Sequence, residues 1–417
     1  MDDTVQMLTV RTDKVIFFFL PVIYILLPSF PSLASGGIIS IWFFLLSSIF
    51  FLSILKANRI AFDFNSKLIF IYFLSFIFLL LVSLALDVKS NFIAKADLIE
   101  LPKVACYFLI TYGTYLTVKR TSRLNIQLHY LNRAVVFIFI FIFIFNIFDI
   151  FDIYGFRHLS FTLYKRETVT ILQNKAIAPF SQTYQLGSLM ILILVYFFIG
   201  SMKLPGNKKV IMFLGFLCAL LILLLTQSRS SLLAFIISLS LCILFASSRR
   251  TLVQALLFLS TILFFGVLYN NEIYDFLREK LPYMISGIES MVGGSNNSVN
   301  YRSEQIYWVI DNSSLIIGMG VSKAHYMFES LYSLYLYRYG VFGLLLFLLL
   351  CVLNFVNYYR ASFYHKQHDY LLLAISIWFL SYPVTALSSA HQDTPKLALV
   401  FYGLTGLGFA LNRKVKL

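Results

Sequence analysis

Long apolar runs alternate with short polar connections along almost the whole chain of 417 residues. A helix needs about 20 mostly apolar residues to cross a bilayer. Twelve runs reach or approach this length, near 15–33, 37–55, 68–86, 101–118, 134–151, 184–202, 210–226, 231–247, 252–269, 329–357, 370–387 and 396–411. The pattern therefore predicts an all-α polytopic integral membrane protein with about 12 transmembrane helices, organised as a single membrane domain over residues 1–417.

Two connections are much longer than the others and differ in their pattern. One covers residues 152–183, between the fifth and sixth spans. The other covers residues 270–328, between spans nine and ten, and begins with the amphipathic stretch EIYDFLREKLPYMISGIESM. We expect 152–183 to form an external loop, and 270–328 to form a large external loop subdomain lying on the membrane surface.

The composition supports the membrane prediction, because 59% of the residues are hydrophobic and only 12% are charged, against about 25% charged in soluble domains. The four cysteines all lie in apolar runs and lack the spacing of a metal site. No phosphate-binding loop, dinucleotide fingerprint or Cys/His zinc cluster occurs. The net charge of +14 would suit nucleic acid in a soluble protein, but here its distribution between the two membrane faces is more informative.

The basic residues concentrate in every second connection and at both termini, whereas most acidic residues fall in the remaining connections. The first set contains Lys56, Arg59, Lys67, Lys119, Arg120, Arg123, Arg133, Lys203, Lys208, Lys209, Arg249, Arg250, Arg360 and Lys366, and the second contains Asp87, Asp97, Glu100, Asp152, Glu272 and Glu289. Cytoplasmic loops carry an excess of lysine and arginine. Both termini are therefore predicted to be cytoplasmic.

Several cations break this rule, and Arg229 in the stretch TQSRSSLLAF is the most informative of them. It opens a span whose N-terminus faces outward, where the helix dipole disfavours a cation and favours an anion. Ser228 and Ser230 add hydroxyl donors, and the arginine fork binds phosphate oxygens in pairs. We predict a phosphate or diphosphate site here, with a structural salt bridge as the alternative.

Arg302, in YRSEQIYWVI, is a second external arginine and could clamp the same diphosphate, or it could lie on a solvated amphipathic helix beside Glu304. Other external cations are weaker candidates, because such residues often only anchor a helix end. They are Arg157, Lys165, Arg166, Lys175 and Lys323.

The stretch GMGVSKAHYMFESLYSLYLYRYGVFG holds the candidates for proton transfer. His325 and Glu329 are four residues apart and would share a face if a helix began before His325. They could act as general base and helper toward a sugar hydroxyl. The alternatives are a surface histidine and an acid in the first turn of a helix. His391 and Asp393, between the last two spans, form a weaker pair.

The chain resembles the bacterial O-antigen polymerase and ligase superfamily, most closely the Wzy-type polymerases, over roughly residues 150–345. The resemblance rests on NKAIAPFSQTYQLG, TQSRSSLLAF, YRSEQIYWVI, IIGMG and ESLYSLYLYRYGVFG, which occur in this order. Ligases typically carry His-Asn eleven residues before the glycine that is Gly340 here, where this chain has Glu329-Ser330. This departure favours a polymerase, with Glu329 as the base, and weakens the case for His325.

The resemblance implies a membrane-embedded, GT-C-like glycosyltransferase of the bacterial inner membrane, inverting and metal-independent, with its active site facing the periplasm. It would join undecaprenyl-diphosphate-linked oligosaccharide repeat units into O antigen or another surface polysaccharide. Membrane lipids and a separate chain-length regulator would be its partners, with no cofactor, metal or nucleic acid. Two alternatives stay open: an O-antigen ligase that transfers polymer to lipid A-core, and a lipid-linked oligosaccharide flippase or transporter.

Overall fold

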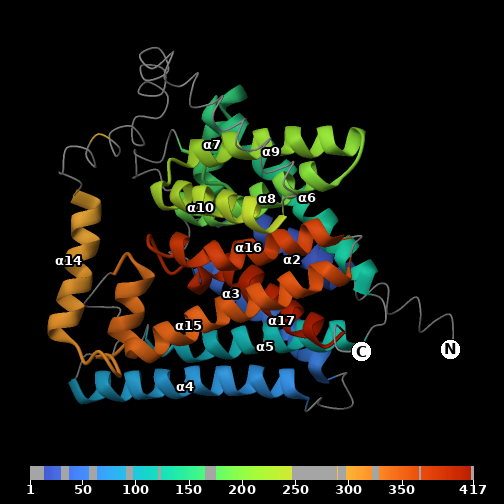
Figure 1. The fold of residues 1–417 in the computed structure, drawn as a ribbon. Helices are drawn as coiled ribbons and strands as arrows, with labels where there is room; N and C mark the ends of the chain where they lie inside the picture. The colour runs from blue at the N-terminus through green and yellow to red at the C-terminus, as the bar shows by residue number, and fades with distance from the viewer. Residues whose placement is uncertain are drawn as a thin grey trace.

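The computed structural model describes residues 14–29, 37–55, 63–90, 97–120, 124–164, 175–246, 289, 297–321, 328–365 and 368–414. Within these ranges all regular structure is helical (Figure 1). The elements are η1 (Val15–Phe19), α2 (Leu20–Leu26), α3 (Gly37–Leu55), α4 (Phe64–Ser90), α5 (Glu100–Arg120), α6 (Leu124–Ile150), η2 (Ile153–Gly155), α7 (Phe156–Leu163), α8 (Thr183–Lys203), α9 (Asn207–Thr226), α10 (Arg229–Ala246), α14 (Asn297–Asn312), α15 (Leu331–Tyr364), α16 (Asp369–Thr385), η5 (His391–Asp393) and α17 (Pro395–Lys414).

Eleven of the twelve predicted spans fall on these helices, and the run 252–269 lies outside the described residues. Among the described helices, five are long and apolar enough to cross a membrane: α4, α6, α8, α9 and α15. Shorter apolar helices include most of α10, α16 and α17. The prediction of an all-α fold is confirmed for the described residues, and the five candidate spans are consistent with a polytopic membrane protein. The number of twelve spans stays a prediction.

Helix α8 lies at the centre of the bundle. In the most apolar stretch of α8, 89% of the residues are buried, against 28% of the residues in the most apolar stretch of α9. Helix α8 packs against α9, α10 and α16, and α16 in turn packs against α15. The peripheral helices leave large apolar side chains exposed, such as Phe78 on α4 and Ile211 on α9, as expected of surfaces that face lipid.

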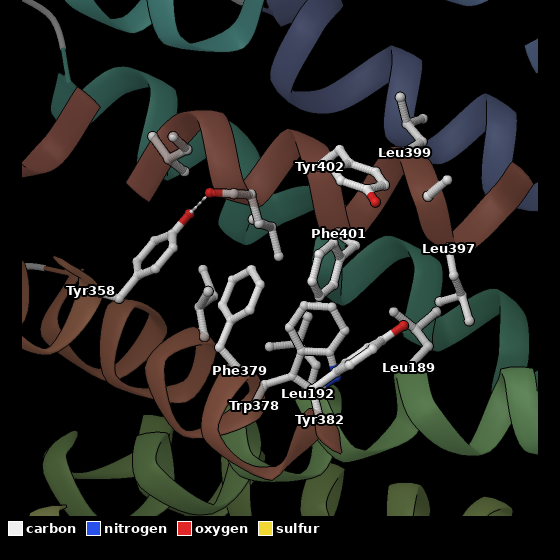
Figure 2. Close-up of a cluster of buried hydrophobic side chains, with 14 of the residues drawn as sticks. Leu189, Leu192, Tyr358, Trp378, Phe379, Tyr382, Leu397, Leu399, Phe401 and Tyr402 are labelled. Atoms are coloured by element: carbon white, nitrogen blue, oxygen red, sulfur yellow. Dashed lines mark hydrogen bonds between the residues drawn. The ribbon is translucent and has the colours of Figure 1, made fainter. Parts of the chain in front are cut away.

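Aromatic side chains of α15, α16 and α17 fill the space between these helices and α8 (Figure 2). The rings of Tyr382 and Phe401 have centroids 4.9 Å apart. The polar groups of two neighbouring aromatic residues are hydrogen-bonded. The indole N–H of Trp378 donates to the Ser188 carbonyl at 2.9 Å, and the Tyr358 hydroxyl donates to the Leu404 carbonyl at 2.6 Å. These buried contacts join four helices tightly, so the positions of their ends are well determined.

Helix α15 is interrupted at Gly340, which adopts φ 63° and ψ −165°. A Cβ atom at this position would lie 2.2 Å from the Ile316 carbonyl oxygen, so only glycine fits. The segment that follows α14 pairs with the break, because Val341 N donates to Leu315 O and Met319 N to Tyr337 O, both at 2.7 Å. The predicted span near 329–357 falls on α15, and Gly340 divides this helix into a short half-helix and the part that crosses the bundle.

The two ends of the bundle carry different side chains. At one end the Lys119 ammonium lies 3.0 Å from Asp63 and the Lys203 ammonium lies 2.6 Å from Asp369. The opposite end holds the start of α8, the α9–α10 junction, the half-helix of α15 and the η5 turn. In Figure 1 this end is on the left, beside α14, and the C-terminal end of α17 is on the right.

Candidate functional site

Arg229 lies at a sharp junction between two helices. Helix α9 ends at Thr226 and α10 begins at Arg229, so only Gln227 and Ser228 connect them. Gln227 adopts the left-handed region with φ 53°, which turns the chain within two residues. A close approach to α8 fixes this junction, because a Cβ atom on Gly187 would lie 2.1 Å from the Ser231 hydroxyl oxygen. The first turn of α10 is thereby held against the beginning of α8.

The serines around Arg229 form a connected group of hydroxyls. The Ser228 hydroxyl lies 2.8 Å from that of Ser231 and 3.5 Å from that of Ser230. Ser228 and Ser231 are buried, whereas Arg229 and Ser230 are half-buried. The predicted donors do lie together at the start of a helix, and Ser230 and Arg229 are the members that a ligand can reach.

Arg302 and Glu329 form an ion pair across two elements, with Nη2 of Arg302 3.0 Å from Oε2 of Glu329. Arg302 and Gln305 are three residues apart on α14 and share a face, and the Gln305 side-chain oxygen accepts a hydrogen bond from Glu329 N at 3.2 Å. Arg302 is thus directed at Glu329, which lies 27 residues later in the chain. The alternative that Arg302 only lies on a solvated helix beside Glu304 is therefore wrong. The Nε of Arg302 is buried without a hydrogen-bond acceptor among the described residues.

The charge of Arg302 also acts on Arg229, so the two predicted arginines lie within electrostatic range of each other. Lys175 joins them, because burial and, secondarily, the charge of Arg229 lower the pKa of its ammonium group to about 8. Among the described residues, Lys175, Arg229 and Arg302 therefore interact electrostatically in series, and Arg302 is paired with the Glu329 carboxylate. Like charges held together in this way favour binding of a polyanion.

A second wall of the site consists of Tyr184, Ser389 and His391. Ser389 lies near the Tyr184 hydroxyl, which also interacts electrostatically with Glu329 and Arg302. The His391 ring stacks on that of Tyr184 with centroids 5.2 Å apart. His391 therefore contacts the site through Tyr184.

His391 is neutral at physiological pH, because complete burial lowers the pKa of its imidazole to about 4. Its Nε2 lies 2.9 Å from the Thr385 carbonyl oxygen, which can only accept, so Nε2 carries the proton. Asp393 is directed elsewhere and accepts a hydrogen bond from the Tyr335 hydroxyl at 3.2 Å, and burial raises the pKa of its carboxyl. The predicted His391–Asp393 pair does not form.

Other sequence candidates separate from the site or fall outside the described residues. Arg157 donates to the carbonyls of Asp149 and Ile150 at the end of α6, which satisfies that helix terminus. Lys165, Arg166, Lys323 and His325 lie outside the described residues. Glu329 precedes the first turn of α15, because Ser330 is the N-cap and accepts from Tyr332 N, so the alternative of a first-turn acid is wrong.

Tyr184, Gln305 and Ser389 were not predicted as site residues from the sequence. Tyr184 stands at the edge of a span, where tyrosines are common for interfacial reasons. Gln305 was distinguishable only by its three-residue spacing from Arg302. Nothing around Ser389 signals that it lies near Tyr184, because Ser389 belongs to the connection after α16, which is adjacent to the start of α8 only in the folded bundle. Within the described ranges, no group of three or more His, Cys, Asp or Glu side chains is placed to hold a metal ion.

A family model described as O-antigen ligase matches residues 214–348. The match covers the elements that carry Arg229, Arg302 and Glu329. A search of curated protein sequences finds no significant match. The family match confirms, for residues 214–348, the predicted resemblance to the superfamily of O-antigen polymerases and ligases.

Proposed function

We propose that this protein is a surface-polysaccharide polymerase that joins lipid-diphosphate-linked repeat units by glycosyl transfer. The observation that carries the proposal is the Arg302–Glu329 ion pair, with Arg302 also within electrostatic range of Arg229. These residues come from three elements, all inside the segment that resembles the O-antigen ligase family. The site combines groups suited to an anionic leaving group with a carboxylate that can accept a proton.

The donor in this proposal is a growing glycan on undecaprenyl diphosphate. Arg229, Arg302 and Lys175 bind its diphosphate, and the positive end of the α10 dipole adds to their attraction. The α9–α10 connection is only two residues long, which keeps Arg229 at the depth where a lipid-tethered diphosphate lies. This explains an arginine placed between two apolar helices.

Glu329 is the proposed base, and its ion pair with Arg302 represents the substrate-free arrangement. Both side chains are partly accessible, with exposed fractions of 31% for Arg302 and 49% for Glu329, and such pairs exchange at small cost. When the diphosphate recruits Arg302, Glu329 loses its cationic partner and becomes a better proton acceptor. Donor binding and base activation are thereby coupled.

The transfer itself forms one glycosidic bond and breaks another. The acceptor is the non-reducing end of a single repeat unit on its own undecaprenyl diphosphate, and one of its hydroxyl oxygens attacks the anomeric carbon of the donor. The bond from that carbon to the diphosphate breaks, and the electron pair leaves with the diphosphate, stabilised by the cations. Glu329 takes the hydroxyl proton. Attack opposite the leaving group inverts the anomeric centre, and neither a metal nor a cofactor enters the reaction.

We further propose that the site faces the periplasm from the inner membrane, with both termini in the cytoplasm. The segregation of Lys119 and Lys203 at the end opposite to the site supports this orientation. A lipid-linked oligosaccharide is available there already activated, so no nucleotide sugar is needed. Membrane lipids surround the bundle, and we expect a separate chain-length regulator protein to act on it; nucleic acid is not an expected partner.

A ligase is the second candidate, because the matching family is described as O-antigen ligase. It would use the same donor site but transfer the finished polymer to lipid A-core. The presence of Glu329-Ser330 where ligases typically carry His-Asn favours the polymerase. A flippase is less well supported, since the buried amide of Asn146, a candidate for a polar transport path, is engaged with backbone groups of residues 142, 177 and 178.

The test is a strain deleted for the gene and complemented with wild type, Arg229→Ala or Glu329→Ala, whose lipopolysaccharide or capsule is separated on a gel. The polymerase predicts that deletion leaves lipid A-core with a single repeat unit and that neither variant restores long polymer. Long polymer on undecaprenyl diphosphate beside bare core would indicate a ligase. Repeat units retained on the cytoplasmic side would indicate a transporter and would overturn the assigned site.

A further inference from the structure

The short segment 176–180 precedes α8 and is buried in the bundle end that holds the site. Lys175 comes directly before it, and Tyr184 follows it by four residues. We propose that Asn146 and Lys396 are positioning residues that hold this segment, so that Lys175 and Tyr184 face the lipid diphosphate and the acceptor. The inference rests on the proposed function and extends it to two residues that touch no substrate.

Asn146 binds two consecutive peptide groups of the segment from α6. Its Nδ2 donates to the Ala178 carbonyl at 2.8 Å, and its Oδ1 accepts from Ile177 N at 2.9 Å. Asn146, Ile177 and Ala178 are all fully buried. Buried backbone groups that belong to no helix need hydrogen-bond partners. Asn146 is the partner of two such groups, and its two hydrogen bonds fix the position and the orientation of the segment.

Lys396 binds the same segment from α17. Its ammonium donates to the Pro179 carbonyl and to the Leu27 carbonyl, the latter at 2.5 Å. It also lies 5.3 Å from the ring centroid of Tyr164 and 5.8 Å from that of Phe180. The residue is 4% exposed, and no ion pair is found for it within the described ranges.

A buried ammonium held by carbonyls and rings is a costly way to stabilise a fold, because burying a charge requires full compensation. An apolar side chain would fill the same space at less cost. Ionisable groups at this depth in a membrane protein are functional candidates by default. The location of Lys396 indicates the function, since it lies five residues after His391 in the chain.

The contacts of Lys396 connect the two walls of the site. It joins the segment before Tyr184 to the stretch that contains His391, and the His391 ring stacks on that of Tyr184. A third connection fixes the segment to the end of α9, where Ala176 N donates to the Leu225 carbonyl at 2.9 Å, four residues before Arg229. The segment is therefore held from α6, α9 and α17 together.

The test is a non-additivity experiment on the purified full-length chain in lipid nanodiscs, with a lipid-diphosphate-linked repeat unit as substrate. Asn146→Asp and Lys396→Met are each made in the wild type and in a background that carries Lys175→Met and Tyr184→Ala. Lys396→Arg retains the donors and is the conservative variant. Asn354→Leu is the matched control, because Asn354 is a buried amide bonded to Leu350 O and Thr405 Oγ1 inside the bundle.

We expect Lys396→Met to lower kcat by about 10²-fold in the wild type, the size of effect that small misplacement causes. In the background that lacks the Lys175 and Tyr184 side chains, it should lower kcat by less than about threefold further, since coupled residues are not additive. Asn146→Asp should behave alike, and Lys396→Arg should recover part of the loss. Asn354→Leu should lower the melting temperature and change kcat by the same factor in both backgrounds.

Equal fold losses for the Lys396 and Asn146 variants in both backgrounds would overturn the positioning role, as would no loss at all. If Lys396→Met does not fold, Asn146→Asp decides the same comparison. Polymer synthesis by the wild type separates this result from the proposed function, which would then stand. If the wild type makes no polymer, the proposed function fails and the inference falls with it.

Discussion

Arg302 has two partners in the proposed reaction, and the free energies involved are suited to an exchange between them. Its ion pair with Glu329 is partly exposed, and such pairs contribute about 0–1 kcal/mol to stability. A diphosphate offers more negative charge and more oxygen acceptors than one carboxylate. Arg302 is therefore expected to move to the donor, which leaves Glu329 to act on the acceptor hydroxyl.

Glu329→Gln keeps the size of the side chain but removes the base. We predict that kcat falls by about 10²- to 10⁴-fold, the usual contribution of general base catalysis, with little change in donor affinity. Arg302→Ala should instead weaken donor binding as well as lower kcat. Turnover of a labelled lipid-linked repeat unit measures both. Glu304→Gln is the control, since Glu304 is exposed on the same helix; equal losses in Glu304→Gln and Glu329→Gln would contradict the assignment.

The lowered pKa of Lys175, about 8, predicts a pH dependence of donor capture. The ammonium is charged below that pH and neutral above it, so the attraction for the diphosphate weakens as the pH rises. The value of kcat/KM for the donor should fall between about pH 7 and 9, because this ratio reports groups of the free enzyme. Lys175→Arg stays charged over this range and should abolish the fall, whereas a flat wild-type profile would refute the role.

At the residue level, the sequence predicted the site residue whose charge is unfavourable at its position in the chain. Arg229 is an arginine where the helix dipole and the charge bias both disfavour one. Tyr184 and Ser389 carry no such conflict, because a tyrosine and a serine are ordinary at a span end. They become part of the site only through packing of α8 against the segment that follows α16.

The break in α15 determines where Glu329 lies. Three backbone features produce it: the left-handed Gly340, the hydrogen bond from Val341 N to Leu315 O, and the bond from Met319 N to Tyr337 O. Asp87 at the end of α4 adds support, because its carboxylate accepts from Val321 N at 2.6 Å. The half-helix Leu331–Tyr339 is therefore fixed by its neighbours, and Glu329 stands at its start.

Gly340→Ala tests the importance of this break. A Cβ atom would lie 2.2 Å from the Ile316 carbonyl oxygen and would need a left-handed backbone, so we predict a loss of about 1–3 kcal/mol in stability together with reduced turnover. Thermal unfolding and polymer synthesis measure the two effects. Gly206→Ala is a closely matched control, since Gly206 has φ 59° but nothing within 4 Å of the added atom; a similar effect in both variants would show that backbone strain alone is responsible.

The break could not be predicted from the pattern along the chain. Residues 331–357 read as one apolar run, and a glycine inside such a run is common in transmembrane helices. Its partner Ile316 belongs to the connection after α14, which the sequence placed in the predicted external loop subdomain 270–328. The interruption arises from pairing between segments whose contact no local pattern encodes.

For the whole molecule, alternation of apolar and polar runs predicted most of the helices, because the bilayer requires spans of a fixed length. The same pattern assigned the basic connections to one end, and Lys119 and Lys203 lie there. The order of packing was not predictable. The central position of α8 follows from contacts with α9, α10 and α16, yet its sequence is no more apolar than that of α9.

The bundle explains how residues from distant segments form one site. Helices α8, α15, α16 and α17 are joined by buried aromatic contacts such as those of Trp378 and Phe401 (Figure 2), and this packing fixes the ends that carry Tyr184, Glu329 and His391. Helix α14 adds Arg302 from outside the bundle (Figure 1). The site is therefore a property of the assembled end of the protein, and no single loop contains it.

The most direct test of the central claim uses purified protein in nanodiscs with an undecaprenyl-diphosphate-linked repeat unit labelled in its sugar. The account predicts a ladder of lipid-linked dimers, trimers and longer chains, with one lipid diphosphate released for each bond formed. Arg229→Ala that folds like the wild type should lose about 10²- to 10³-fold in turnover, as expected for removing a group that stabilises the developing charge. Absence of any ladder from the folded wild type, or a ladder of normal length from Arg229→Ala, would contradict the account.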